Sequence, residues 1–228
     1  MKKFFWYLII FTLVFSLAAC TGNTNSDAEL PNQEEQNNPI EEQPNNEGKN
    51  DVDDKDVPVE PDQQIEETIE IEGMKEKITL NLYNPGILNF RTYIPSDFIA
   101  EEASSGEGDG FWFYSNFEGK KQENVYLHFY FFSENIKEEP NIDDKDSTFA
   151  IMLEGLEPIF PEDKYYDWSI KEFASPNSAK YAALGEHNDQ YFVVIQDYPY
   201  EYADGMGPRI NKVIEHFYWT DTEEYLSK

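Results

Sequence analysis

The segment "DYPYEYADGMGPRINK", residues 197–212, combines residue types that often line binding sites. Tyr198, Tyr200 and Tyr202 alternate along the chain. An extended backbone would place their three rings on one face, because successive side chains of a strand point to opposite sides. Such a row of rings could stack on a sugar or on another flat ligand. The alternative is a structural corner in which the tyrosines only pack.

Arg209 lies in the same segment and is one of only two arginines in the chain, the other being Arg91. In so acidic a sequence we expect it to have a fixed partner, either an internal carboxylate such as Asp204 or a ligand. Two glycines at 205 and 207 precede a predicted helix, whose free N–H groups could receive an anion. The candidate ligand or partner site is therefore Tyr198, Tyr200, Tyr202, Asp204 and Arg209.

Motifs of covalent catalysis and metal binding are missing from the sequence. It contains no G-x-S-x-G or S-x-x-K set and no H-E-x-x-H motif. His128, with Tyr126 and Tyr130 on the same predicted face, is expected to be a packed, hydrogen-bonded histidine. His187 falls in a predicted turn and His216 on a predicted helix, so a metal site would require all three to meet in space. We predict no catalytic residue, no metal and no cofactor.

The acidic run "NIDDKD", residues 141–146, could offer oxygens to Ca²⁺, but it lacks the spacing and the glycine of an EF-hand loop. We interpret it as a solvated loop that leads into a helix N-terminus, where acidic residues suit the helix dipole. Binding of a divalent cation remains the alternative.

Cys20, the only cysteine, follows features typical of a signal peptide. Met1-Lys2-Lys3 is a short positive start, and residues 4–16 are an uncharged apolar run. That run is too short to span a bilayer comfortably. Leu17-Ala18-Ala19-Cys20 then resembles a bacterial lipobox at all four positions. An ordinary signal peptide with a chance cysteine, or an uncleaved anchor, is the alternative.

The lipobox resemblance implies that residues 1–19 are removed and that the sulfur of Cys20 carries a diacylglyceryl group. Two acyl chains are enough for stable anchoring, whereas one holds only weakly. The resemblance implies a protein held on the outer face of the cell membrane of a Gram-positive bacterium, with the lipid bilayer as its first partner. The chain also resembles uncharacterised lipoproteins of Bacillus-like bacteria, and that likeness supplies no activity.

Residues 20–65 are interpreted as the lipidated cysteine and a disordered acidic tether, since this segment has too little apolar surface to offset the entropy of ordering. Residues 21–65 contain 13 acidic residues and two lysines, and the signal segment contains two lysines. Of the net charge of −29, −20 therefore belongs to residues 66–228, the single predicted domain. Such a domain is not expected to bind nucleic acid.

Alternating apolar residues predict strands across the domain, beginning with a hairpin over 67–83 around Gly73. Further strands are expected at 88–94, 110–117, 125–132, 178–187 and 191–198. The run at 191–198 is apolar on both faces, so we expect it in the centre of the sheet, paired with 178–187 through a turn at 187–189.

Helices are predicted at 146–160, capped by Ser147 or Asp146, and at 208–219, with Pro208 in the first position. Residues 165–175 fit either a strand or a short helix. The fold class is therefore α+β: an antiparallel sheet of about five to seven strands with two or three helices packed on it.

"LNFRTYIPSDF", residues 88–98, is similar to a signature of the Mog1/PsbP-like fold, with Phe90, Pro95 and Phe98 in matching places. Ile94 and Phe98 depart from the usual Tyr and Trp. The resemblance implies an accessory or binding protein more than an enzyme.

These features together favour a membrane-anchored lipoprotein with a non-catalytic binding or accessory domain, whose partner is an envelope protein or a small ligand. Two alternatives stay open. One is an envelope hydrolase that acts on cell-wall material through Asp204, Arg209 or His128. The other is a divalent-cation-binding surface protein.

Overall fold

The computed structural model describes residues 60–227, in which mostly antiparallel strands form two sheets. The predictions for the signal peptide, for Cys20 and for the tether up to residue 59 lie outside this range. The five-stranded sheet has the order β1 (Gln64–Ile71), β2 (Met74–Tyr83), β3 (Phe90–Pro95), β11 (Tyr218–Trp219) and β12 (Glu224–Tyr225). The seven-stranded sheet has the order β4 (Phe98–Ser104), β5 (Gly108–Ser115), β6 (Tyr126–Phe132), β10 (Gln190–Asp197), β9 (Tyr181–His187), β8 (Lys171–Ala174) and β7 (Glu157–Pro158).

The predicted hairpin over 67–83 is confirmed as β1 and β2, which pair in antiparallel register. Its turn residues Glu72 and Gly73 have φ of 50° and 78°. Two positive φ values are what a tight two-residue hairpin turn requires, because such a turn matches the twist of the strands. Strand β1 begins at Gln64, two residues before the start we predicted for the domain.

The strands predicted at 110–117, 125–132, 178–187 and 191–198 are confirmed as β5, β6, β9 and β10. Strand β10 is the fourth of seven, so its central position is also confirmed. The turn between β9 and β10 holds Asn188 and Asp189 at positive φ, as in the β1–β2 turn.

A single sheet was expected, and that expectation is wrong. After β3 the chain turns at Ser96 and Asp97 and enters the second sheet as β4, a strand that the sequence pattern did not indicate. Four of its seven residues are exposed. Strand β4 lies at the edge of its sheet, where one side needs no partner, so its few apolar residues are sufficient.

Helix α2 runs over Ala203–Glu215, so the prediction of a helix over 208–219 was wrong at both ends. Pro208 is inside the helix instead of opening it. The early start is explained by Met206, which is fully buried and extends the apolar stripe by one turn. The last residues of the predicted helix leave it to form β11, which pairs with β3.

Helix α1 covers only Thr148–Met152 of the predicted 146–160. Ser147 is the N-cap, as expected, and its hydroxyl accepts a hydrogen bond from the backbone N–H of Ala150. The chain then turns at Gly155, whose φ is +81°, and the predicted helix end becomes β7. Of the ambiguous segment 165–175, the last part is strand β8.

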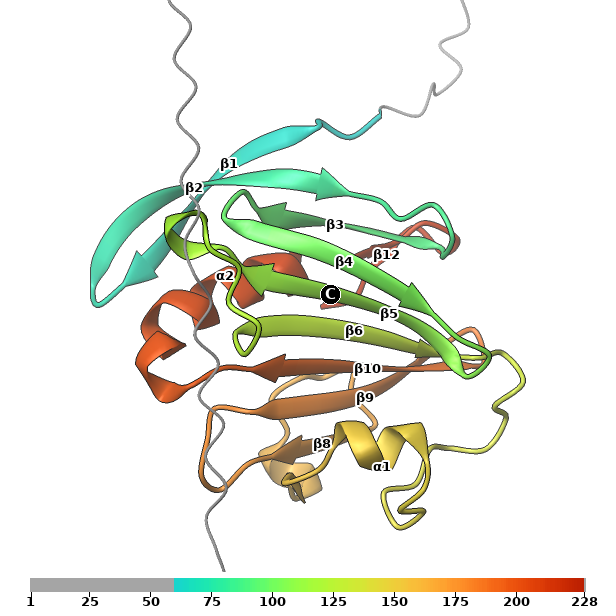
Figure 1. Ribbon diagram of the computed structural model, residues 1–228. Coiled ribbons are helices and arrows are strands. Elements are labelled where there is room, and N and C mark those ends of the chain that lie inside the picture. Colours follow the sequence, from blue (N-terminus) through green and yellow to red (C-terminus); the bar gives the residue numbers. More distant parts are fainter. Residues whose placement is uncertain (1–59, 228) are drawn as a thin grey trace, which may run out of the picture. The chain divides into compact units, whose positions relative to one another are not determined.

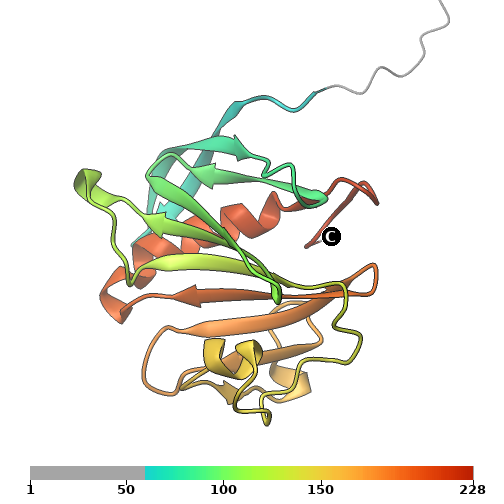
Figure 2. The same ribbon diagram turned by 45° about the vertical axis from the view of Figure 1, so that its right-hand side comes forward.

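Two apolar cores flank the seven-stranded sheet (Figures 1 and 2). The larger core lies where this sheet packs against α2 and the five-stranded sheet. Phenylalanines from several strands fill it. The smaller core lies on the opposite face, where α1 covers β8, β9 and β10. Short 3-10 turns at Phe117–Gly119, Pro161–Asp163 and Tyr200–Tyr202 complete the fold. Within residues 60–227, no helix has the length and apolar character needed to cross a membrane.

Candidate functional site

The structure brings His187 and Trp219 together at one end of the two sheets. His187 ends β9 and Trp219 ends β11, and the two rings stack with centroids 3.7 Å apart and an interplanar angle of 2°. Trp219 is buried against Phe131, Phe192 and Phe217, so the indole is fixed by the main core. The imidazole therefore rests on a rigid aromatic surface.

Asp221 holds His187 from the side. The Nε2 atom of His187 lies 2.9 Å from Oδ1 and 3.1 Å from Oδ2 of Asp221. Asn188 donates from Nδ2 to Oδ2 at 2.9 Å, and the backbone N–H of Thr222 donates to Oδ1 at 3.0 Å. Partial burial acts to raise the pKa of Asp221, but the bonds and charge of His187 and the bond from Asn188 outweigh it, so the pKa is lowered.

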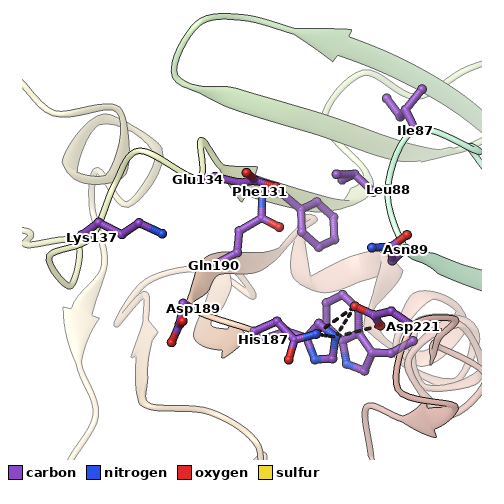
Figure 3. A pocket seen from close by; sticks show the side chains of 12 residues that line it. Ile87, Leu88, Asn89, Phe131, Glu134, Lys137, His187, Asp189, Gln190 and Asp221 are labelled. Carbon is purple, nitrogen blue, oxygen red and sulfur yellow. Dashed lines mark hydrogen bonds and ion pairs between the residues drawn. The ribbon is translucent and has the colours of Figure 1, made fainter.

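These residues line a cavity of about 380 Å³ (Figure 3). Its walls come from the β2–β3 loop, the end of β6 with the loop after it, the β9–β10 turn and the segment that follows β11. The lining residues are Ile87, Leu88, Asn89, Phe131, Glu134, Lys137, His187, Asn188, Asp189, Gln190, Trp219 and Asp221. We call this the His187 cavity.

The chemistry of the His187 cavity suits binding through hydrogen bonds and charge. Glu134, Asp189 and Asp221 provide three carboxylates against the single amine of Lys137. None of the lining residues is a serine, threonine, tyrosine or cysteine, so the cavity offers no hydroxyl or thiol nucleophile. The Nε2 atom of His187 is the ring nitrogen that bonds to Asp221, and Nδ1 makes no hydrogen bond to another residue of the described range.

The structure does not bring the five predicted site residues together. Tyr198 is buried, Tyr200 is 61% exposed, and Tyr202 stacks on Phe117 with centroids 6.1 Å apart. Residues 200–202 form a 3-10 turn instead of the extended backbone that would place the three rings on one face, as the structural-corner alternative expected. Only Tyr198 and Tyr200 line a common cavity.

Arg209 does have an internal carboxylate as its partner, but the partner is Asp97 and not Asp204. The Nε atom of Arg209 donates to Oδ2 of Asp97 at 3.0 Å, and Nη1 donates to the carbonyl of Gly205 at 2.9 Å. Asp204 is exposed, and its side chain makes no hydrogen bond or ion pair with another residue between 60 and 227. The arginine thus ties α2 to the turn between the two sheets.

The other histidines are held apart from His187. His128 is buried and stacks on Trp112 with centroids 4.0 Å apart, as a packed histidine should, yet its Nε2 has no hydrogen-bond partner among the described residues. Burial lowers the pKa of His128 to about 3. His216 follows α2 and lies with Nε2 3.2 Å from Oε1 of Glu67.

No group of three or more histidine, cysteine, aspartate or glutamate side chains within residues 60–227 could hold a metal ion. The acidic run at 141–146 is a turn-rich loop that leads into α1, as expected. Comparisons of the chain with protein-family models, with curated proteins and with solved structures gave no match.

Sequence reasoning missed the His187 cavity because its parts are far apart in the chain. His187 was expected in a turn, which is nearly correct, but Trp219 was assigned to a helix. The one available signal was the Asn188-Asp189 pair, whose preference for positive φ fixes the end of β9.

Proposed function

We propose that this protein is a membrane-anchored lipoprotein whose domain is a non-catalytic binding module of the bacterial cell envelope. In this proposal the lipid on Cys20 holds the chain at the outer face of the membrane. The domain then captures an envelope protein or a small polar ligand in the His187 cavity.

The anchor is supported by the sequence alone. A positive start, a 13-residue uncharged apolar run and Leu17-Ala18-Ala19-Cys20 occur in the order and at the depth expected for a lipoprotein signal. The net charge of the domain would be repelled by an anionic membrane surface, so covalent lipid supplies an attraction that the domain itself lacks.

The single observation that carries the binding role is the fixed arrangement of His187. Its ring is clamped between the indole of Trp219 and the carboxylate of Asp221, and it borders an open cavity. A rigid, pre-formed polar site suits ligand capture, because little ordering is needed on binding. The excess of carboxylates over amines favours a ligand that carries a cationic amine or several hydrogen-bond donors.

An envelope hydrolase is the second candidate, and the same histidine favours it. A His–Asp pair could activate a water molecule through Nδ1, although no hydroxyl or thiol nucleophile lines the cavity. Release of soluble fragments from purified cell wall by the wild-type protein, abolished by His187→Ala, would replace the binding role with this one.

Photo-crosslinking in intact cells tests the binding role. A photoreactive amino acid is placed at Ile87, which lines the cavity and is 58% exposed, in the full-length protein. The matched control carries it at Phe160, which is 71% exposed and does not line the His187 cavity. A discrete adduct from position 87 that is missing from position 160 is expected. Equal adducts from both positions, or none from position 87, would contradict the proposal.

A further inference from the structure

Part of the outer face of the seven-stranded sheet is left open. Helix α1 packs over β8, β9 and β10 and reaches Phe132 at the end of β6, whereas the other end of β5 and β6 on this face has no α-helix on it (Figure 1). Tyr114 on β5 and Tyr126 on β6 lie on this face and are partly exposed. This open region shares no residue with the His187 cavity.

Three side chains form a row across the strands. Tyr114 is directly opposite Tyr126, and Tyr126 is directly opposite Asp197 on β10. The two tyrosine rings meet edge to face, with centroids 5.6 Å apart, so Tyr114 supports Tyr126 from one side. The hydroxyl of Tyr126 donates to Oδ2 of Asp197 over a long 3.4 Å. The row thus leads from an aromatic surface to a carboxylate.

Beyond Asp197 the row opens into a cavity of about 400 Å³. Tyr200 lines it and is 61% exposed, although nothing in the described range stacks on its ring. Asn124 and Asn177, both exposed, add amide groups that can donate and accept hydrogen bonds. We call Tyr126, Asp197, Tyr200, Asn124 and Asn177 the tyrosine strip.

Asp197 is under-satisfied for a partly buried carboxylate. Among the described residues, the bond from Tyr126 is the only hydrogen bond that its side chain accepts, and it is a weak one at this length. Burial raises the pKa of Asp197, while Lys180 and Tyr126 oppose that rise. A desolvated carboxylate with free acceptor sites favours a ligand that brings hydroxyl or amide donors.

We propose that the tyrosine strip binds an uncharged glycan, with sugar rings packed on Tyr126 and Tyr200 and sugar hydroxyls donating to Asp197. A pyranose has an apolar C–H face and a polar rim, which match exposed aromatic rings bordered by carboxylate and amide groups. Glu201 beside the cavity and the net charge of the domain oppose anionic polymers. The strip would be a second site, independent of the ligand of the His187 cavity.

The test uses the mature full-length protein purified from membranes in lauryldimethylamine oxide, a detergent without a sugar headgroup. Chitohexaose and cellohexaose serve as neutral probes and polygalacturonate as the anionic one, in titration calorimetry. Binding of at least one neutral hexasaccharide is expected, and polygalacturonate is not expected to bind. Tyr200→Ala should lower the affinity for the neutral ligand about fivefold to tenfold, since one stacked ring contributes on that order.

Tyr165→Ala is the matched control, because Tyr165 is 67% exposed and lies outside the tyrosine strip. It should leave glycan affinity unchanged, whereas Asp197→Asn should weaken it. Tyr200 is exposed enough that its removal should not unfold the domain, which a thermal melt verifies. The proposal is overturned if no neutral hexasaccharide binds at millimolar concentration, if Tyr200→Ala and Tyr165→Ala behave alike, or if polygalacturonate binds as tightly as the neutral probes. Because the His187 cavity is unchanged in these variants, crosslinking from Ile87 reports on the first proposal separately.

Discussion

The imidazole of His187 lies parallel to the indole of Trp219, with ring centroids 3.7 Å apart. One ring ends β9 in the seven-stranded sheet and the other ends β11 in the five-stranded sheet. The contact therefore joins the two sheets at the edge of the His187 cavity. Asp221 completes the clamp by accepting the hydrogen bond from Nε2.

Because His187 and Asp221 are in direct contact, the losses in unfolding free energy on replacing each of them should not be additive. We expect His187→Asn and Asp221→Asn each to lower the free energy of unfolding, and the double variant to lose less than the sum by about 0.5–1 kcal/mol. Urea unfolding of the four proteins at pH 7 measures this coupling. A double variant whose loss equals the sum of the two single losses would show that the two side chains do not stabilise each other.

The Arg209–Asp97 pair is predicted to be structural. Asp97→Ala leaves the partly buried guanidinium without its carboxylate, so we expect a loss of about 1–3 kcal/mol in unfolding free energy. Arg209→Lys should also be less stable than the wild type, because an ammonium cannot reproduce the bonds from Nε to Asp97 and from Nη1 to Gly205. Asp204→Ala is the control, since its side chain is exposed, and it should have nearly wild-type stability. Equal effects of Asp97→Ala and Asp204→Ala would contradict this assignment.

The parts of the fold that the sequence predicted are those with strong local patterns. The alternation in β1 and β2 and the apolar runs of β6 and β10 specify strands by themselves. Strand β4 carries few apolar residues, and its pairing with β5 is decided by the sheet and not by its own pattern. Helix α2 includes Gly205 and Gly207, which disfavour a helix locally, so its first turn depends on the burial of Met206.

The residues that come together in each site were less predictable, because they are joined by contacts between distant parts of the chain. Asp97 is 112 residues from Arg209, and no local spacing links them. The three tyrosines at 198, 200 and 202 suggested a shared face, but Tyr198 was needed in the core. Of these three tyrosines, Tyr200 has the most exposed ring, at 61%. The proposed stacking on a sugar therefore involves the tyrosine strip instead of the three alternating tyrosines.

Glu172 is predicted to make the stability of the domain fall at low pH. Its side chain is buried and accepts hydrogen bonds from the backbone N–H groups of Tyr165 and Tyr166 and from the hydroxyls of Ser169 and Tyr181. Burial acts to raise its pKa, but these bonds together lower it below the ordinary value of 4.5. The stabilisation is therefore complete above about pH 5 and is lost as the pH falls through the lowered pKa.

Glu172→Gln should accordingly be less stable than the wild type by about 1–3 kcal/mol at pH 7, with a smaller difference at pH 3. Urea midpoints at the two pH values measure this difference. Glu162→Gln is the control, because Glu162 is exposed and makes none of these bonds. The assignment fails if the difference between Glu172→Gln and wild type is as large at pH 3 as at pH 7.

His128 should make a second contribution to the loss of stability at low pH. Its pKa is lowered from 6.5 to about 3 by burial, so between these values the unfolded chain binds a proton that the folded chain does not. Stability should then fall on acidification by up to about 1.4 kcal/mol per pH unit below pH 6.5. His128→Phe keeps an aromatic ring beside Trp112 and removes both the proton and the unpaired Nε2. We expect it to match the wild type at pH 7.5 and to exceed it at pH 5; a variant that is equally acid-sensitive would rule His128 out as the cause.

Mass spectrometry of the intact protein purified from bacterial membranes tests the proposed lipoprotein most directly. The account predicts a chain that begins at Cys20, with residues 1–19 removed and the added mass of a diacylglyceryl group on the sulfur. Cys20→Ala should carry no lipid mass and should retain the signal segment. A mature wild-type protein with unmodified Cys20, or one that still begins at Met1, would contradict the proposed anchor.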